Sequence, residues 1–179
     1  MAFDLGGILQ KYIGGTSAPN PNETVDHFHQ VAQSASPDAI SQGLAAAFRS
    51  DATPPFGQMA GQLFGQANPN QQAGMLNQLL GGMGPSVLAS LMGGAGGGAL
   101  GGLLGRLSPG GTAAPITPEQ ASQFTPEQVN QIATHAEQHS PGIVDKMSEF
   151  YAQHTGLVKT LGGAVLAIAL AKMANNQSS

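Results

Sequence analysis

The stretch FGQMAGQLFGQ, Phe56 to Gln66, decides the fold, because glycine followed by glutamine recurs in it every four residues. On an α-helix, residues four apart share a face, so the glycines at 57, 61 and 65 form one nearly axial stripe. Such a stripe lets a second helix backbone approach closely, and the glutamines beside it can hydrogen-bond across the contact. A weak helix or a turn region is the alternative, since each glycine costs about 1 kcal/mol relative to alanine.

Charge is scarce around this stretch, because no charged residue occurs in the 54 positions from Ala52 to Gly105. Charged residues make up 9% of the chain, against about 25% in ordinary soluble proteins. Only 6 lysines and arginines are present and the net charge is −4, so no basic patch can neutralise phosphates. We therefore expect no nucleic-acid partner.

The chain contains no cysteine, so neither a disulfide framework nor thiolate chemistry is available. Residues 1–5 carry no basic region, and the apolar stretch after them is interrupted by two glycines, so we expect no signal peptide. A cytoplasmic location is consistent with both features, and we expect peripheral membrane contact as the alternative.

Several short segments carry helix-start signals followed by apolar residues at helical spacing. Asn22-Glu23 and Ser36-Pro37-Asp38 predict two amphipathic helices, and Asn68-Pro69-Asn70-Gln71 combines an N-cap, a proline at the first position and a glutamine that returns to the cap. The helix that starts after Asn68 should end near Gly81-Gly82, and another should begin at Pro85.

A second glycine stripe follows at positions 93, 97, 101 and 105, with leucines such as Leu100 and Leu104 beside it. Either this is a close-packed helix with a glycine face and a leucine flank, or it is a flexible linker. The leucines argue against a pure linker, because Gly/Ser linkers seldom carry so many.

The clearest boundary lies at 108–116, where prolines and paired glycines disfavour regular structure. Beyond it, Thr117-Pro118-Glu119-Gln120 and Thr125-Pro126-Glu127-Gln128 repeat one capping box and predict two helix starts. The sequence thus divides into short N-terminal helices (1–51), an uncharged helical segment (52–107), a linker (108–116) and a C-terminal helical bundle (117–179).

The apolar segment Leu157 to Met173 has 12 uncharged residues between Lys159 and Lys172, whereas a bilayer core needs about 20. It is therefore a poor transmembrane helix and a good candidate for the central helix of a bundle or for an oligomer interface. Small residues at positions 163, 167 and 171 would allow close pairing.

Catalytic and metal-binding patterns are weak. His135 and His139 share a helix face, but no third ligand is obvious, and Glu137 lies about 200° from His135 around the helix. No nucleophile–histidine–acid order, phosphate loop or dinucleotide fingerprint is present. We therefore expect no enzyme activity, no catalytic residue, no metal and no cofactor.

The alternation of paired glycines with leucine and glutamine in residues 71–107 resembles small, uncharacterised YidB-like bacterial proteins. The uncharged apolar segment beside a helical, oligomer-forming part also resembles the stalk subunit of high-affinity uptake hydrogenases. That second resemblance implies a scaffold for a large enzyme that offers quinone an apolar route.

Together these features predict an all-α, non-enzymatic scaffold that forms homo-oligomers or packs with a protein partner through apolar glycine-rich helices. Exposed apolar faces in a chain with so few charges would promote aggregation, which favours a covered interface. The alternative is a carrier that encloses lipid or quinone between the Gly/Leu segment and the last helix. The expected interface residues are Gly57, Gly61, Gly65, Gly97, Leu100, Gly101, Leu104, Gly105, Gly163, Ala167 and Ala171.

Overall fold

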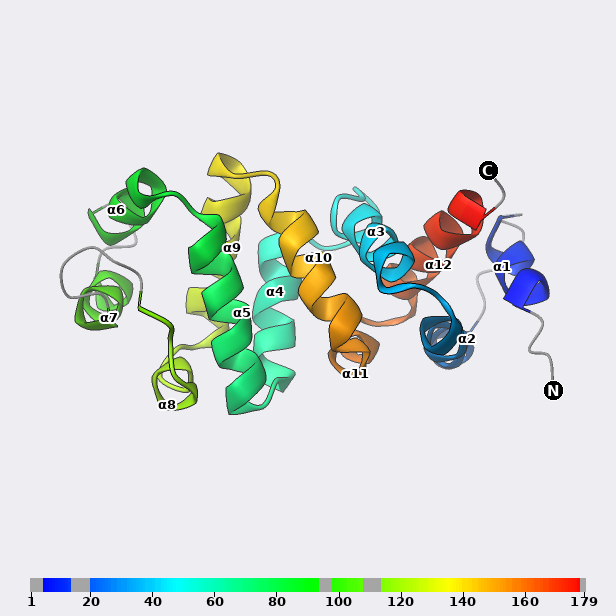
Figure 1. The fold of residues 1–179 in the computed structure, drawn as a ribbon, viewed down its shortest axis with the longest axis horizontal. Helices are drawn as coiled ribbons and strands as arrows, with labels where there is room; N and C mark the ends of the chain where they lie inside the picture. The colour runs from blue at the N-terminus through cyan, green and yellow to red at the C-terminus, as the bar shows by residue number, and fades with distance from the viewer. Residues whose placement is uncertain (1–4, 14–19, 94–97, 108–113, 178–179) are drawn as a thin grey trace. The chain divides into compact units, whose positions relative to one another are not determined.

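The computed structural model describes residues 5–13, 20–93, 98–107 and 114–177. Within these ranges the chain forms twelve α-helices and one 3-10 helix, and no β-strand (Figure 1). The all-α fold predicted from the sequence is confirmed.

The helices are short and follow one another closely. They are α1 (Leu5–Ile13), α2 (Pro21–Ser34), α3 (Pro37–Phe48), α4 (Phe56–Gln66), α5 (Pro69–Gly82), α6 (Pro85–Gly93), α7 (Ala99–Leu107), α8 (Pro118–Ala121), α9 (Pro126–His139), α10 (Ile143–Gln153), α11 (Thr155–Val158), the 3-10 helix η1 (Lys159–Leu161) and α12 (Gly163–Gln177).

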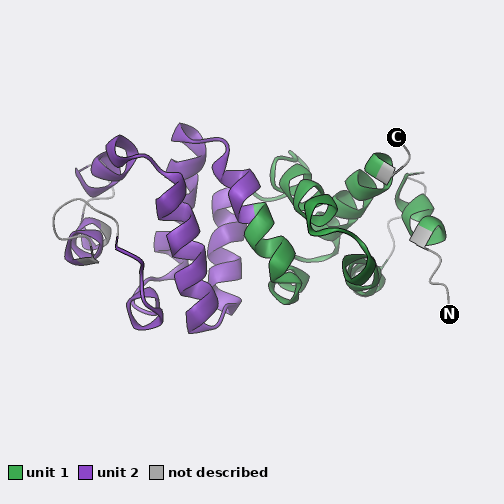
Figure 2. Ribbon diagram, viewed as in Figure 1, with its two compact units in different colours: residues 1–55, 148–179 green, residues 56–147 purple. Residues whose placement is uncertain are grey.

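The helices gather into two compact units that do not follow the order of the chain (Figure 2). Unit 1 comprises residues 1–55 and 148–179, and unit 2 comprises residues 56–147. This grouping differs from the linear four-part division suggested by the sequence, because the two ends of the chain contribute to the same unit.

Unit 1 is built around α12, which packs against α3 and also contacts α1 and α2. Its core is formed by aliphatic and aromatic side chains that are almost fully buried: Phe28, Val31, Ile40, Leu44, Phe48, Tyr151, Leu166, Leu170 and Met173. Helix α12 thus packs mainly against helices of the N-terminal segment, whereas the sequence predicts a bundle within residues 117–179.

Unit 2 is built around the pairing of α4 with α9. Helix α5 packs against α8 and α9, and α6 packs against α7 and α9. The buried side chains of this unit include Met59, Leu63, Phe64, Met75, Leu76, Leu79, Val129, Ile132 and Ala133.

Four predicted helix starts are confirmed by the hydrogen bonds of their capping side chains. Complete capping boxes open α5 at Asn68, α8 at Thr117 and α9 at Thr125, and the Ser36 hydroxyl accepts a hydrogen bond from the Ala39 N–H at the start of α3. Each cap satisfies backbone donors that the first helical turn leaves unpaired.

Two features depart from the expected pattern. Helix α1 carries no start signal and was not predicted. The apolar C-terminal segment is not one helix, because it breaks at Gly162, whose φ of 88° lies in the left-handed region that favours glycine.

The end of the expected linker is anchored to α5. The side-chain amide of Asn77 donates to the Ile116 carbonyl at 3.1 Å, and the Ile116 N–H donates to the Asn77 Oδ1 at 2.7 Å. The Ile116 side chain is buried. Residues 108–113 of the expected linker lie outside the described residues.

Candidate interaction site

The glycine stripe of α4 faces α9 of the same chain. A Cβ atom on Gly61 would lie 2.5 Å from the Pro126 carbonyl oxygen, and one on Gly65 would lie 3.2 Å from the Pro126 ring. A Cβ on Gly57 would collide with the Thr134 hydroxyl and lie 2.7 Å from Asn130 Oδ1. The two backbones therefore approach as closely as the four-residue spacing predicts, and the approaching helix comes from the same chain.

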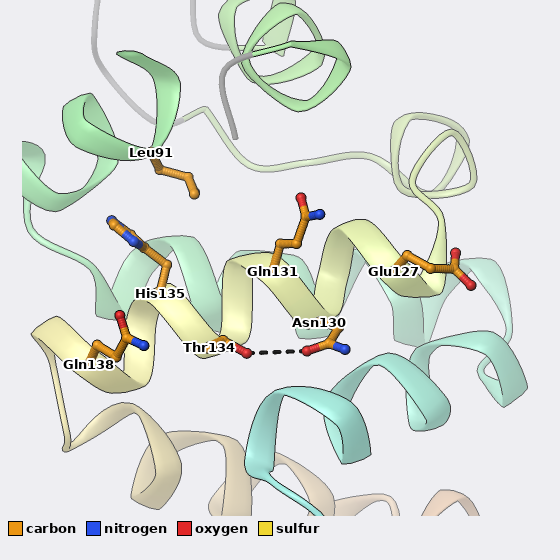
Figure 3. A pocket seen from close by; sticks show the side chains of 7 residues that line it. All are labelled: Leu91, Glu127, Asn130, Gln131, Thr134, His135 and Gln138. Atoms are coloured by element: carbon orange, nitrogen blue, oxygen red, sulfur yellow. Dashed lines mark hydrogen bonds between the residues drawn. The ribbon is translucent and has the colours of Figure 1, made fainter. Parts of the chain in front are cut away.

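Asn130 and Thr134 are tied to each other on this face. The Thr134 hydroxyl donates to Asn130 Oδ1 at 3.2 Å, as the dashed line in Figure 3 shows. The bond satisfies two polar groups that lie half-buried beside the glycines. The glutamine stripe of α4 is exposed at Gln58, Gln62 and Gln66.

Only part of the second glycine stripe is approached closely by another described residue. Within the hairpin of α6 and α7, a Cβ on Gly101 would lie 2.8 Å from the Met92 carbonyl oxygen, and Leu104 is buried. By contrast, a Cβ on Gly98, Gly102 or Gly105 would meet no described atom within 4 Å.

Other expected interface residues are distributed differently. Gly97 lies outside the described residues, as does the side chain of Leu100. In α12, a Cβ on Gly163 would lie 2.6 Å from the Pro21 Cα, whereas Ala167 and Ala171 are half-buried.

One close contact has no signal in the sequence. A Cβ on Gly43 of α3 would lie 2.7 Å from the carbonyl oxygen of Ala169 in α12. Gly43 is followed by an alanine-rich run and belongs to no repeated spacing, so its role as a point of backbone approach could not be recognised.

An open cavity of about 490 Å³ lies in unit 2 beside the exposed face of α9 (Figure 3). Six of its lining residues come from α9 and one from α6: Glu127, Asn130, Gln131, Thr134, His135, Gln138 and Leu91. The lining is dominated by uncharged hydrogen-bonding groups, with one carboxylate.

His135 connects this face to α6. A ring nitrogen of His135 lies 2.9 Å from the Ser90 hydroxyl, and the same hydroxyl donates to the Val87 carbonyl at 2.8 Å. A hydroxyl carries one proton, so donation to Val87 leaves His135 as the donor in its contact with Ser90. In that arrangement the histidine cannot accept the serine proton, as activation of a nucleophile requires.

The rings of His135 and His139 are tilted by 37° with their centroids 4.3 Å apart, and Nδ1 of His139 is hydrogen-bonded to the His135 carbonyl. Among the described residues, no group of three or more His, Cys, Asp or Glu side chains is placed to hold a metal ion.

Within the described part of the chain, no helix combines the length and the apolar character needed to cross a bilayer. Comparisons with protein-family models, with curated proteins and with solved structures find no match to this chain.

Proposed function

We propose that this protein is a non-enzymatic assembly protein that self-associates through the open glycine face of α7. The face consists of Gly102 and Gly105 of α7 and of Gly98, which immediately precedes the helix; all three are exposed and are spaced i, i+4 and i+7. That spacing places all three within a narrow arc of one helical face.

The observation that carries the proposal is the contrast between the glycine stripe of α4 and the open glycine face of α7. Each glycine in a helix costs about 1 kcal/mol relative to alanine. At Gly57 and Gly61 the close packing of α9 offsets that cost. At Gly102 and Gly105 no described residue packs closely enough to offset the cost of glycine. A helix from a second copy that packed there would offset it.

A second copy of this chain is the partner that suits the face. An apolar helix with glycines at this spacing packs against another of its kind, because small residues let the two backbones touch. No charged residue lies between Ala52 and Gly105, so Arg106, in the last turn of α7, is the one charge on this helix.

The structure offers less support for a lipid or quinone carrier. Among the side chains that the structure describes, which exclude those of Leu5, Leu100 and Leu107, Ile13 is the one large hydrophobic group that is exposed. Four of the seven residues that line the cavity beside α9 carry an amide or a hydroxyl group, and Leu91 is its one aliphatic residue, whereas ligand pockets for apolar molecules are mostly hydrophobic.

The test is the mass of the detergent-free, full-length protein by light scattering over a range of concentrations. We expect a defined oligomer for the wild type and a monomer for the double variant Gly102→Leu, Gly105→Leu. Leucine has a higher helix propensity than glycine, so the variant should remain helical and lose only the close approach.

The matched control is Gly81→Leu in α5, a glycine at which a Cβ would also meet no atom within 4 Å. It should leave the oligomer unchanged. A wild type that stays monomeric at every concentration would overturn the proposal, as would a double variant that associates like the wild type. A monomer that releases stoichiometric lipid on solvent extraction would favour the carrier.

A further inference from the structure

Helices α2 and α9 are alike in length and in the proline that opens each of them. Both contain 14 residues, start with proline at the first helical position and follow an N-cap residue, Asn20 or Thr125. A chain turn then leads to a second helix, preceded by Ser36-Pro37 in one case and by Ser140-Pro141 in the other. The second helix starts at Pro37 itself in α3 and two residues after Pro141 in α10.

The same positions are buried in the two helix pairs. When residues 20–34 are aligned with 125–139, and 36–50 with 140–154, eight matched pairs are buried on both sides. They are Thr24 and Val129, Phe28 and Ala133, Val31 and Ala136, Ile40 and Val144, Gly43 and Met147, Leu44 and Ser148, Ala47 and Tyr151, and Phe48 and Ala152.

Residue identity is low across this alignment. It is confined to Pro21 with Pro126, Gln33 with Gln138, Ser36 with Ser140, and Pro37 with Pro141. Three matched pairs are buried on one side only: His27 and Ile132, Ala39 and Ile143, and Ala45 and Glu149. The conserved property is the pattern of burial, while the sizes of the buried side chains differ widely, as between Ala47 and Tyr151. Two copies of one helix pair that have repacked their cores would show this combination.

Each helix pair packs against a helix from the other half of the chain, although α10 of the second pair is divided between the units, with residues 148–153 in unit 1. Helix α4 follows the first pair along the sequence, yet it belongs to unit 2 and packs against α9 of the second pair. Helix α12 follows the second pair, yet it belongs to unit 1 and packs against α3 and α2 of the first pair (Figure 2).

The two exchanges share one contact and differ in another. The proline that opens the first helix of each pair is covered by a glycine of the exchanged helix: Pro126 by Gly61, and Pro21 by Gly163. The difference is that α4 packs mainly against the first helix of its pair, whereas α12 packs mainly against the second. Each half therefore supplies one helix to the other, although α4 and α12 pack against different members of their helix pairs.

We infer that the chain carries two copies of one helix pair, α2–α3 and α9–α10, on either side of the segment 108–113, and that each side supplies a helix that packs against the copy on the other. Each unit contains helices from both halves of the chain, so neither unit can form from one half alone. This inference goes beyond the proposed self-association through α7 and does not depend on it.

The test uses the full chain with a protease recognition sequence inserted between Gly110 and Gly111 and an affinity tag at the N-terminus. The folded protein is cut and passed over the affinity matrix and a sizing column. We expect the untagged C-terminal half to stay bound and to elute with its partner, with helical circular dichroism unchanged. Halves that separate while each stays helical would overturn the inference.

A second measurement distinguishes association from simple failure to separate. In the double variant Gly102→Leu, Gly105→Leu, which we expect to be monomeric, the urea midpoint of the cut protein should rise with protein concentration, because unfolding then releases two molecules. The midpoint of the uncut double variant should not change with concentration. The variant Gly61→Leu should lower the midpoint of the cut protein, and Gly81→Leu should not. A cut protein whose midpoint is independent of concentration would contradict the inference.

The outcomes for the two proposals can be told apart. An uncut chain that is monomeric, but whose cut halves remain together, would refute association through α7 and leave the exchanged halves standing. An uncut chain that is oligomeric, but whose halves separate after cleavage, would refute the exchanged halves and leave association through α7 standing.

Discussion

The carbonyl oxygen of Pro126 lies 2.5 Å from the point that a Cβ atom on Gly61 would occupy. No real Cβ atom approaches an oxygen this closely, so any side chain at position 61 must push α4 and α9 apart. The obstacle is backbone, which cannot rotate away as a flexible side chain can. The pairing of these two helices thus depends on glycine at that position.

The variant Gly61→Ala should therefore be destabilised by about 1–3 kcal/mol, the usual cost of overpacking a filled core. Alanine's higher helix propensity offsets part of that cost, by up to about 1 kcal/mol. Urea unfolding followed by circular dichroism would measure the change. The matched variant Gly81→Ala lies in α5, where a Cβ would meet no described atom within 4 Å, and should be neutral or stabilised. Equal effects at both positions would contradict this account of the α4–α9 contact.

The Asn77 side chain holds the backbone of Ile116 through both of its hydrogen-bonding groups. Asn77→Ala removes both partners and leaves a half-buried N–H and carbonyl to find water, so we expect a loss of about 1–3 kcal/mol. Hydrogen exchange should also show faster exchange at the Ile116 amide. Gln78→Ala, at the neighbouring exposed position, should change stability by less than about 0.5 kcal/mol. An Ile116 amide that stays equally protected in Asn77→Ala would show that other contacts hold this segment.

Local chemistry explains which elements the sequence could predict. The starts of α3, α5, α8 and α9 follow from residues adjacent to them, because a capping side chain bonds to N–H groups within three positions. The same reasoning overstated the first Thr-Pro-Glu-Gln box, which opens a helix of only 4 residues. Pro126, eight positions after Pro118, already begins the next helix.

The partners of the helices could not be predicted in the same way. The spacing of Gly57, Gly61 and Gly65 predicts a close approach, but nothing in it specifies that the approaching helix is α9, some 60 to 80 residues further on. A glycine face accepts any suitably small helix, and the choice between a helix of the same chain and another chain rests on tertiary packing. The likeness between the pairs α2–α3 and α9–α10 could not be predicted from the sequence either, because it lies in the pattern of burial and hardly at all in residue identity.

The hydroxyl of Tyr151 is fully buried, and no described residue forms a hydrogen bond with it. Its ring packs edge-on against Phe48 and Phe150. A buried hydroxyl without a partner keeps the full cost of losing its water, so Tyr151→Phe should leave stability unchanged or raise it by about 1 kcal/mol. Thermal unfolding of both proteins would measure this. A variant destabilised by more than about 1 kcal/mol would reveal a stabilising hydrogen bond to this hydroxyl.

The same residue should make the protein sensitive to alkali. Burial raises the pKa of Tyr151 above its ordinary value of 10.0. The unfolded chain ionises at that position near pH 10 and the folded chain does not, so the stability contributed by the neutral phenol is present below pH 10 and is lost above it. Each further pH unit should cost about 1.4 kcal/mol until the folded state also ionises. Tyr12, whose pKa burial also raises, adds a background that Tyr151→Phe retains. Urea unfolding between pH 8 and pH 11 should therefore show the wild type losing stability faster than Tyr151→Phe above pH 10. Parallel curves for the two proteins would mean that the phenol reaches solvent before the chain unfolds.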